Sequence, residues 1–175
     1  MLEEIDRKIW VIKVLNFFKY NWQVRDEWFD WCKQLPIEEL LKERTGGVGS
    51  ILGTLFHIAE VEYSWVRAIQ GEEDLVYEFT DYHTLEKVKS LSDQLQNEVA
   101  EFLSKNSAGV NEKVVNVPWD EEKNTVADIL HHIIAHEIHH MGQLSVWARQ
   151  LGLKPVSANF IGREFRSLKL SIQLT

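Results

Sequence analysis

Residues 125–152 read TVADILHHIIAHEIHHMGQLSVWARQLG, and this stretch decides the fold. Thr125 and Asp128 form a variant of the capping box that begins a helix, and Gly152 marks its end. Between them the apolar residues recur at the three- and four-residue spacing of an amphipathic helix, namely Ile129, Ile133, Leu144, Trp147 and Leu151. The sequence therefore predicts a long helix with one face buried in a core.

The rest of the chain predicts three more long helices. Apolar residues follow the helical period over about residues 3–33, 50–70 and 84–107. Gly71 stands directly after the second of these stretches, where a helix commonly ends in a left-handed residue. Four long helices with a crossover loop over residues 72–83 predict an all-α four-helix bundle.

Shorter segments connect and extend the predicted bundle. Residues 37–44 are expected to add a short helical turn after the first helix. Residues 113–124 are predicted to form an irregular hairpin or loop. Residues 167–174 alternate strictly between polar and apolar, which predicts either a short strand that pairs with residues 113–119 or a disordered tail.

The length and composition indicate how many domains the chain has and which kinds of partner it can bind. A length of 175 residues suits one domain, with the bundle over residues 1–155 and residues 156–175 as its C-terminal extension. A net charge of −8 without a cluster of Lys and Arg predicts that the chain binds no nucleic acid. No apolar run approaches transmembrane length and no signal-peptide layout is present, so we expect a cytoplasmic protein without a membrane partner. Cys32 is the only cysteine, which excludes an internal disulfide and predicts a small buried side chain.

Histidines crowd the middle of the predicted C-terminal helix. Of the seven in the chain, five lie within residues 131–140. At about 100° per residue, His140 falls in the middle of the apolar face and His136 beside it, whereas His132 and His139 fall at its edge. Histidine is the commonest metal ligand, and side chains four residues apart project from one face of a helix. This geometry selects His136 and His140 as an inward pair of metal ligands.

A third ligand must come from another helix. His57 borders the apolar face of the helix predicted over residues 50–70, whereas His83 lies in a loop, so His57 is the better candidate. Three neutral imidazoles with one open coordination position are typical of a catalytic site, and they suit Zn²⁺, Ni²⁺ or Fe²⁺. We therefore predict one divalent metal ion bound by His57, His136 and His140.

Three further residues are candidates for supporting roles. Glu62 lies within the apolar stripe of its helix, where it either orients a ligand imidazole or forms a structural ion pair. His132 is a candidate for a contact behind the ligands, and Arg149 either meets a carboxylate of a substrate or faces solvent. Aromatic side chains that line a substrate pocket, or that belong simply to the core, are Trp10, Phe17, Tyr20, Trp22 and Trp65.

Residues 136–140, HEIHH, also satisfy the H-E-x-x-H signature of zinc metalloproteases. In that interpretation Glu137 is the general base, and a downstream residue such as Glu164 is the third ligand. Gln143 stands where the longer form of the motif has glycine, and the upstream chain is predicted helical instead of forming the strands of a protease cleft. The sequence therefore disfavours a protease.

Two blocks of sequence resemble a known family. They are residues 49–65, GSILGTLFHIAEVEYSW, and residues 136–152, HEIHHMGQLSVWARQLG. Through these blocks the chain resembles the DinB/YfiT-like metalloproteins of bacteria over about residues 1–155. The resemblance implies a four-helix bundle, a metal held by the same three histidines, and a homodimer.

The resemblance also implies an activity. Relatives in that family are S-transferases that use low-molecular-weight thiols such as bacillithiol or mycothiol, and related isomerases. By that likeness, a thiol at the metal becomes a thiolate nucleophile near neutral pH and attacks a small-molecule electrophile. Two alternatives stay open. They are a hydrolase in which the metal activates water, and a non-enzymatic stress-response protein whose metal is structural.

Overall fold

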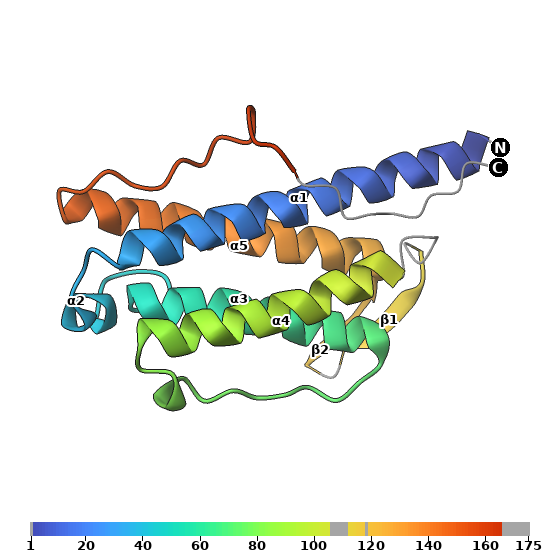
Figure 1. Cartoon of the computed structure of the whole chain (residues 1–175). Coiled ribbons are helices and arrows are strands. Elements are labelled where there is room, and N and C mark those ends of the chain that lie inside the picture. Colours follow the sequence, from blue (N-terminus) through green and yellow to red (C-terminus); the bar gives the residue numbers. More distant parts are fainter. Residues whose placement is uncertain (1, 106–111, 118, 166–175) are drawn as a thin grey trace.

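The computed structural model describes residues 2–105, 112–117 and 119–165. Four long helices form a bundle with a two-stranded hairpin beside it (Figure 1), as predicted. Within the described ranges, no helix is both long and apolar enough to cross a membrane. In chain order the elements are α1 (Leu2–Cys32), α2 (Ile37–Leu41), α3 (Ile51–Gln70), η1 (Phe79–Asp81), α4 (Leu85–Lys105), β1 (Val114–Val117), β2 (Asp120–Thr125) and α5 (Val126–Gln150).

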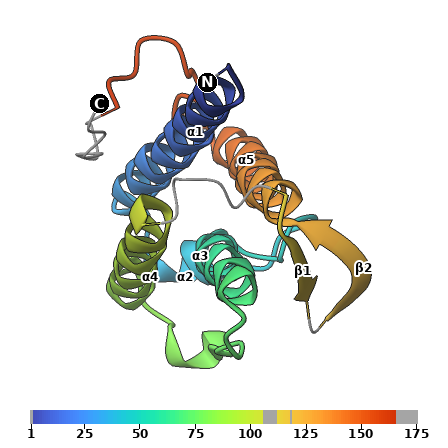
Figure 2. The ribbon, with the colours of Figure 1, turned by 90° about the vertical axis from the view of Figure 1, so that its right-hand side faces the viewer.

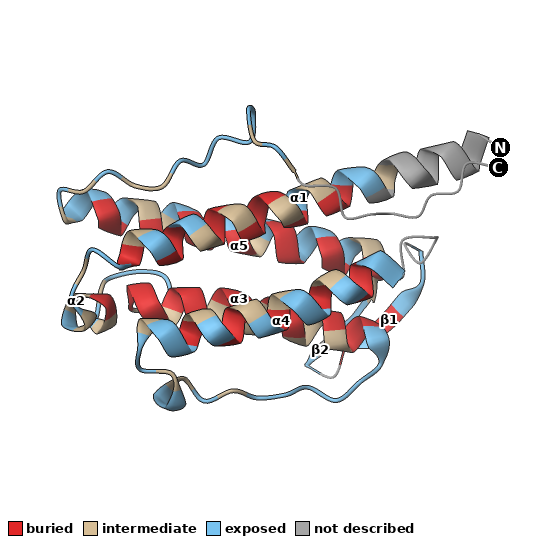
Figure 3. Cartoon of the chain, viewed as in Figure 1, coloured by how far each residue is buried: buried red, intermediate tan, exposed pale blue. Residues whose placement is uncertain are grey.

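The four long helices surround one core. α3 packs against α4 and α5, and α1 packs against the same two helices. Figure 2 looks along the bundle, with α1 and α5 on one side of the core and α4 and α3 on the other. Buried residues recur along the helices (Figure 3), as expected for amphipathic helices. The inward stripe of α4 consists of Val88, Leu91, Leu95, Val99 and Phe102.

Local sequence sets the ends of the two helices that carry the candidate histidines. At the start of α3 the Gly53 N–H donates to Ser50 Oγ at 3.0 Å, and Gly71 ends the helix with a φ of 76°. At the start of α5 the Asp128 N–H donates to Thr125 Oγ1 at 3.1 Å, and the Thr125 N–H donates to Asp128 Oδ2 at 3.0 Å. This reciprocal pair is the predicted capping box.

The connections follow the sequence-based predictions in part. β1 and β2 pair antiparallel, with Val115 opposite Asn124, so residues 113–124 form a hairpin. Val115 and Val117 are buried, and β1 contacts α3, which attaches the hairpin to the bundle. The strand predicted over residues 167–174 lies outside the described residues.

Residues 152–165 lie along α1 after the end of α5 (Figure 1). Trp31 Nε1 donates to the carbonyl of Lys154 at 2.9 Å, and the Tyr20 hydroxyl donates to the carbonyl of Ala158 at 2.8 Å. These side chain–backbone bonds satisfy polar groups of a segment that has no secondary structure of its own. These bonds tie the segment to α1.

Candidate metal centre

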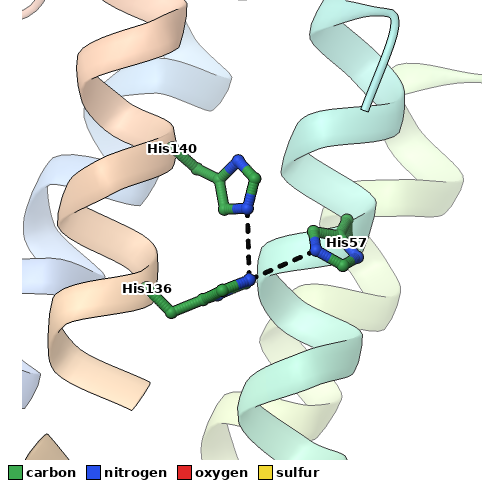
Figure 4. A group of neighbouring side chains, drawn as sticks. All are labelled: His57, His136 and His140. Carbon is green, nitrogen blue, oxygen red and sulfur yellow. Dashed lines mark hydrogen bonds between the residues drawn. The ribbon is translucent and has the colours of Figure 1, made fainter. Parts of the chain in front are cut away.

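Three histidines from two adjacent helices point at one another (Figure 4). His57 projects from α3, and His136 and His140 project from the facing side of α5. His136 Nε2 lies 3.2 Å from His57 Nε2 and 3.1 Å from His140 Nε2. The helical geometry of the sequence predicted this group, and the structure brings all three residues together.

The spacing of the three nitrogens fits a metal ion better than a set of hydrogen bonds. A neutral imidazole Nε2 carries either one proton or one lone pair, so His136 Nε2 cannot make a well-directed hydrogen bond to both neighbours at once. Two ligands of a tetrahedral zinc site, each about 2.0–2.1 Å from the metal, lie about 3.3 Å apart. The observed separations of 3.1 Å and 3.2 Å are close to that value. The donor set could therefore hold a divalent metal ion.

The protonation states also suit metal binding. Burial, together with the neighbouring His140 and His57, lowers the pKa of His136 to about 3. Burial likewise lowers the pKa values of His57 and His140. All three imidazoles are therefore neutral at neutral pH, which is the form that offers a lone pair to a metal.

Two polar residues stand behind the histidines, and sequence reasoning missed both. His140 Nδ1 donates to Gln143 Oε1 at 2.7 Å, which leaves the lone pair of His140 on Nε2, facing the other two histidines. On α3, Glu60 Oε2 lies 4.0 Å from His57 Nδ1. Each partner lies three residues after its histidine, so the i, i+3 spacing on a helix was the signal that could have found them.

Comparison with known proteins identifies the family of the chain. The model of the DinB family matches residues 9–168. The chain belongs to the DinB family. The uncharacterized protein YizA of Bacillus subtilis (strain 168) is 59% identical to it over 156 residues, which are 89% of this chain and 98% of that protein. Protein DinB of the same strain is 24% identical over 146 residues, which are 78% of this chain and 85% of that protein.

In this DinB-family chain, the loop before α3 packs against the partner of His140. Gly47 has a φ of 57°, and a Cβ there would lie 2.7 Å from Gln143 Oε1 and 3.0 Å from the ring of Trp147. Trp147 Nε1 in turn donates to the carbonyl of Thr45 at 3.2 Å. The backbone conformation at position 47 therefore favours glycine, and a Cβ there would displace the Gln143 side chain from its present position.

Glu62 and Glu137 do not face the three histidines of the DinB-family chain. Arg25 is fully buried and donates from Nε to Glu137 Oε1 at 2.7 Å and from Nη2 to Glu62 Oε2 at 2.9 Å. Trp22 Nε1 donates to Glu62 Oε2 at 3.0 Å. The ion-pair alternative for Glu62 is therefore the one observed. Glu137 is held by Arg25 and is not placed as the general base of a protease.

Arg25 attracts both carboxylates of this cluster, whereas the two carboxylates repel each other. Burial disfavours the charged guanidinium, but Glu137 and Glu62 outweigh burial and hold the pKa of Arg25 above its usual value. Burial raises the pKa of Glu137, Arg25 opposes that rise, and the charge of Glu62 adds to it. The cluster thus depends on Arg25 to keep two buried carboxylates compensated.

The other candidates fall in different places. His132 is exposed, and its ring centroid lies 5.0 Å from that of Trp65 and 5.9 Å from that of His136. Arg149 is exposed and donates to the carbonyl of Ser145 at 2.9 Å. Five aromatic side chains were proposed to line a pocket. Of these, Trp65 is the one whose ring contacts His132, the residue that lies beside the ligand His136.

Those remaining aromatic candidates are engaged elsewhere. Trp22 bonds to Glu62 in the core, and the Tyr20 hydroxyl bonds to the segment after α5. Phe17 packs on Phe160 of that segment with ring centroids 5.0 Å apart. The ring of Trp10 meets the edge of His131. Among the described residues, the group that could hold a metal includes the three histidines and no carboxylate, so Glu164 is not part of it.

Proposed function

We propose that this DinB-family protein is a metal-dependent S-transferase that conjugates a low-molecular-weight thiol to a small-molecule electrophile. The observation that carries the proposal is the arrangement of three neutral Nε2 donors. In the part of the chain that the structure describes, no cysteine, carboxylate or further histidine joins this group. The side chain of His57 is 28% exposed, so solvent and small molecules reach the group. Three histidine ligands with a fourth coordination position that small molecules can reach are typical of catalytic metal sites.

Different residues of the chain would have different roles in this reaction. His57, His136 and His140 would hold the metal, and a bound divalent cation supplies the positive charge that lowers the pKa of a thiol. Burial keeps the imidazoles neutral, and Gln143 keeps His140 in the tautomer whose Nε2 is free. In the transfer, the thiol proton passes to solvent, the sulfur forms a bond to the electrophilic carbon, and the leaving group departs with the bonding electrons.

The finer details of the proposal rest on chemistry and on the family resemblance. Imidazole ligands suit Zn²⁺, Ni²⁺ and Fe²⁺, of which we favour Zn²⁺ or Ni²⁺. A bacillithiol-type thiol is the co-substrate that the resemblance supports. A cytoplasmic location stays a prediction from the sequence.

A homodimer is also part of the proposal. It rests on the family resemblance and on exposed apolar residues on the outer side of α5, where Ile138 is 40% and Val146 is 53% exposed. Sedimentation of the purified protein at micromolar concentration measures its mass in solution. A sedimenting mass of one chain would contradict this part of the proposal.

The first experiment measures metal and activity in the same preparations. The protein is purified without a chelating resin, and its metal content is determined by elemental analysis for wild type, His57→Ala and the control His131→Ala. His131 is exposed on α5 and is not part of the histidine group. We expect about one equivalent of metal in wild type and in the control, and a loss in His57→Ala.

Each preparation is then mixed with a small thiol and 1-chloro-2,4-dinitrobenzene, and thioether formation is followed by absorbance. We expect His136→Ala to lose both metal and conjugation. Conjugation that survives this substitution would overturn the proposal. Hydrolysis of an ester substrate without thiol would favour the hydrolase, and metal that stabilises the fold without any reaction would favour a structural metal.

A further inference from the structure

An aromatic row leads away from the candidate metal centre. Its members are Trp119 of the hairpin, Trp65 of α3 and His132 of α5. The ring centroids of Trp119 and Trp65 are 5.5 Å apart, and those of Trp65 and His132 are 5.0 Å apart. His132 in turn lies 5.9 Å from His136, with the two rings inclined by only 34°. The row therefore joins the metal ligands to the hairpin without a break.

The row is accessible, which core packing does not explain. All seven tryptophans lie in the described part of the chain. Trp119 is the most exposed of them, with 46% of its surface accessible to solvent. Trp65 is only partly buried, and His132 is exposed. Large aromatic side chains normally bury their surface, and neighbouring aromatic side chains that stay exposed together mark a surface for a ligand or a partner.

The position along the helices sets the reach of the row. His132 precedes His136 by four residues, and Trp65 follows His57 by eight. At 1.5 Å per residue these spacings correspond to about 6 Å and about 12 Å along the helix axes. A ring that stacks at the His132 end of the row is therefore separated by a few bonds from an atom held at the histidines.

The charge on the other side of His57 limits the kind of ring. Glu60 lies near the carboxylates of Asp74 and Glu78, so acidic groups gather on this side of His57. Glu60 Oε2 lies 4.0 Å from His57 Nδ1. A substrate that approaches the metal past these carboxylates is favoured when it carries no negative charge.

We propose that Trp65, Trp119 and His132 bind an uncharged aromatic ring of the electrophile while its reacting carbon lies next to the thiol sulfur at the histidines. The inference rests on the proposed function, and it defines the substrate class as small molecules with an aromatic ring a few bonds from the reacting atom. Contacts between aromatic rings would make the site bind aromatic substrates more tightly than aliphatic ones, because edge and offset stacking add binding free energy to that of burying apolar area.

The experiment compares two thiols as ligands of the cobalt-loaded protein. Ethanethiol and 2-phenylethanethiol differ by a phenyl ring two carbons away from the sulfur, so their thiol groups are similar, and the phenyl ring stands in for the ring of the electrophile. Binding is read from the sulfur-to-cobalt charge-transfer absorbance, which needs no turnover. We expect 2-phenylethanethiol to bind about tenfold more tightly. The preference should vanish in Trp119→Ala and Trp65→Ala.

Two controls make the result specific. Trp119→Phe keeps a ring and should retain most of the preference. Phe17→Ala removes an aromatic side chain of similar exposure, 41%, on α1 and should leave the preference unchanged. Equal binding of both thiols would overturn the proposed role of the aromatic row, and so would a preference that survives both alanine variants. Either result would leave the S-transferase proposal intact. Absence of the charge-transfer band with either thiol would overturn both.

Discussion

Replacing Arg25 with Met tests whether the buried charge cluster holds the bundle together. Arg25 is fully buried, and it bridges Glu62 of α3 and Glu137 of α5 from its place on α1. The substitution keeps an unbranched apolar side chain but leaves two buried carboxylates without a counter-charge. Removal of one partner from a buried ion pair costs about 3–5 kcal/mol of the free energy of unfolding. At about 2–4 °C per kcal/mol for a domain of this size, we expect Tm to fall by about 6–20 °C.

The pH dependence sharpens this prediction. Burial and the charge of Glu62 already raise the pKa of Glu137 in the wild-type fold, and Arg25 opposes that rise, so the loss of Arg25 raises the folded-state pKa of Glu137 further above that of the unfolded chain. A carboxyl with a raised folded-state pKa contributes stability at low pH and loses it as the pH rises through that pKa. The deficit of Arg25→Met relative to wild type should therefore be larger at pH 8 than at pH 5.

Thermal and urea unfolding, followed by circular dichroism, measure the effect. Lys33→Met is the matched control, because Lys33 pairs with Asp30 at 2.6 Å while both side chains are about 70% exposed, and we expect little change in Tm. The triple variant Arg25→Met, Glu62→Gln, Glu137→Gln removes the charges but keeps the acceptors, and it should recover much of the loss. An Arg25→Met protein with the Tm of wild type at pH 8 would refute the reasoning.

Three further outcomes follow from single features of the structure. Gly47→Ala should lower Tm and weaken metal binding more than Gly46→Ala, measured by calorimetry, since both glycines have positive φ but only a Cβ at 47 meets Gln143. Cys32 is fully buried and burial raises the pKa of its thiol to about 12, so iodoacetamide should label it only in urea, as read by intact mass. Burial lowers the pKa of His136 from 6.5 to about 3, so with EDTA present the wild-type Tm should fall as the pH drops below 6.5, and less so for His136→Asn.

The histidine group could be predicted because helical geometry alone determines which side chains share a face. The rotation per residue places His136 and His140 on the buried side of α5, and the apolar period places His57 on the matching side of α3. The long helices and the capping box follow from patterns of the same short range. The pair His136 and His140, the long helices and the capping box depend on residues within a few turns of one another. His57 lies 79 residues from His136 and was chosen because His83, the other remaining histidine, lies in a loop.

Features that depend on contacts between distant residues were not accessible in this way. Arg25 lies 37 residues from Glu62 and 112 residues from Glu137 along the chain, and no local pattern joins them. The aromatic row likewise needs the hairpin to fold back so that Trp119 meets Trp65. Only the packing of elements decides these pairings, so the sequence left two interpretations for Glu62.

A physical signal for the charge cluster was nevertheless present in the sequence. Arg25, Glu62 and Glu137 are each a lone charged residue on the apolar face of a predicted helix. Lone charges on buried faces must find one another, because an uncompensated buried charge is too costly to keep. Glu137 lies one residue, or about 100°, beyond His136, so the helix turns its carboxylate toward the core when the histidine faces the metal. The H-E-x-x-H match is therefore divided between two sites in this bundle, with the histidines at the metal centre and the glutamate bound to Arg25.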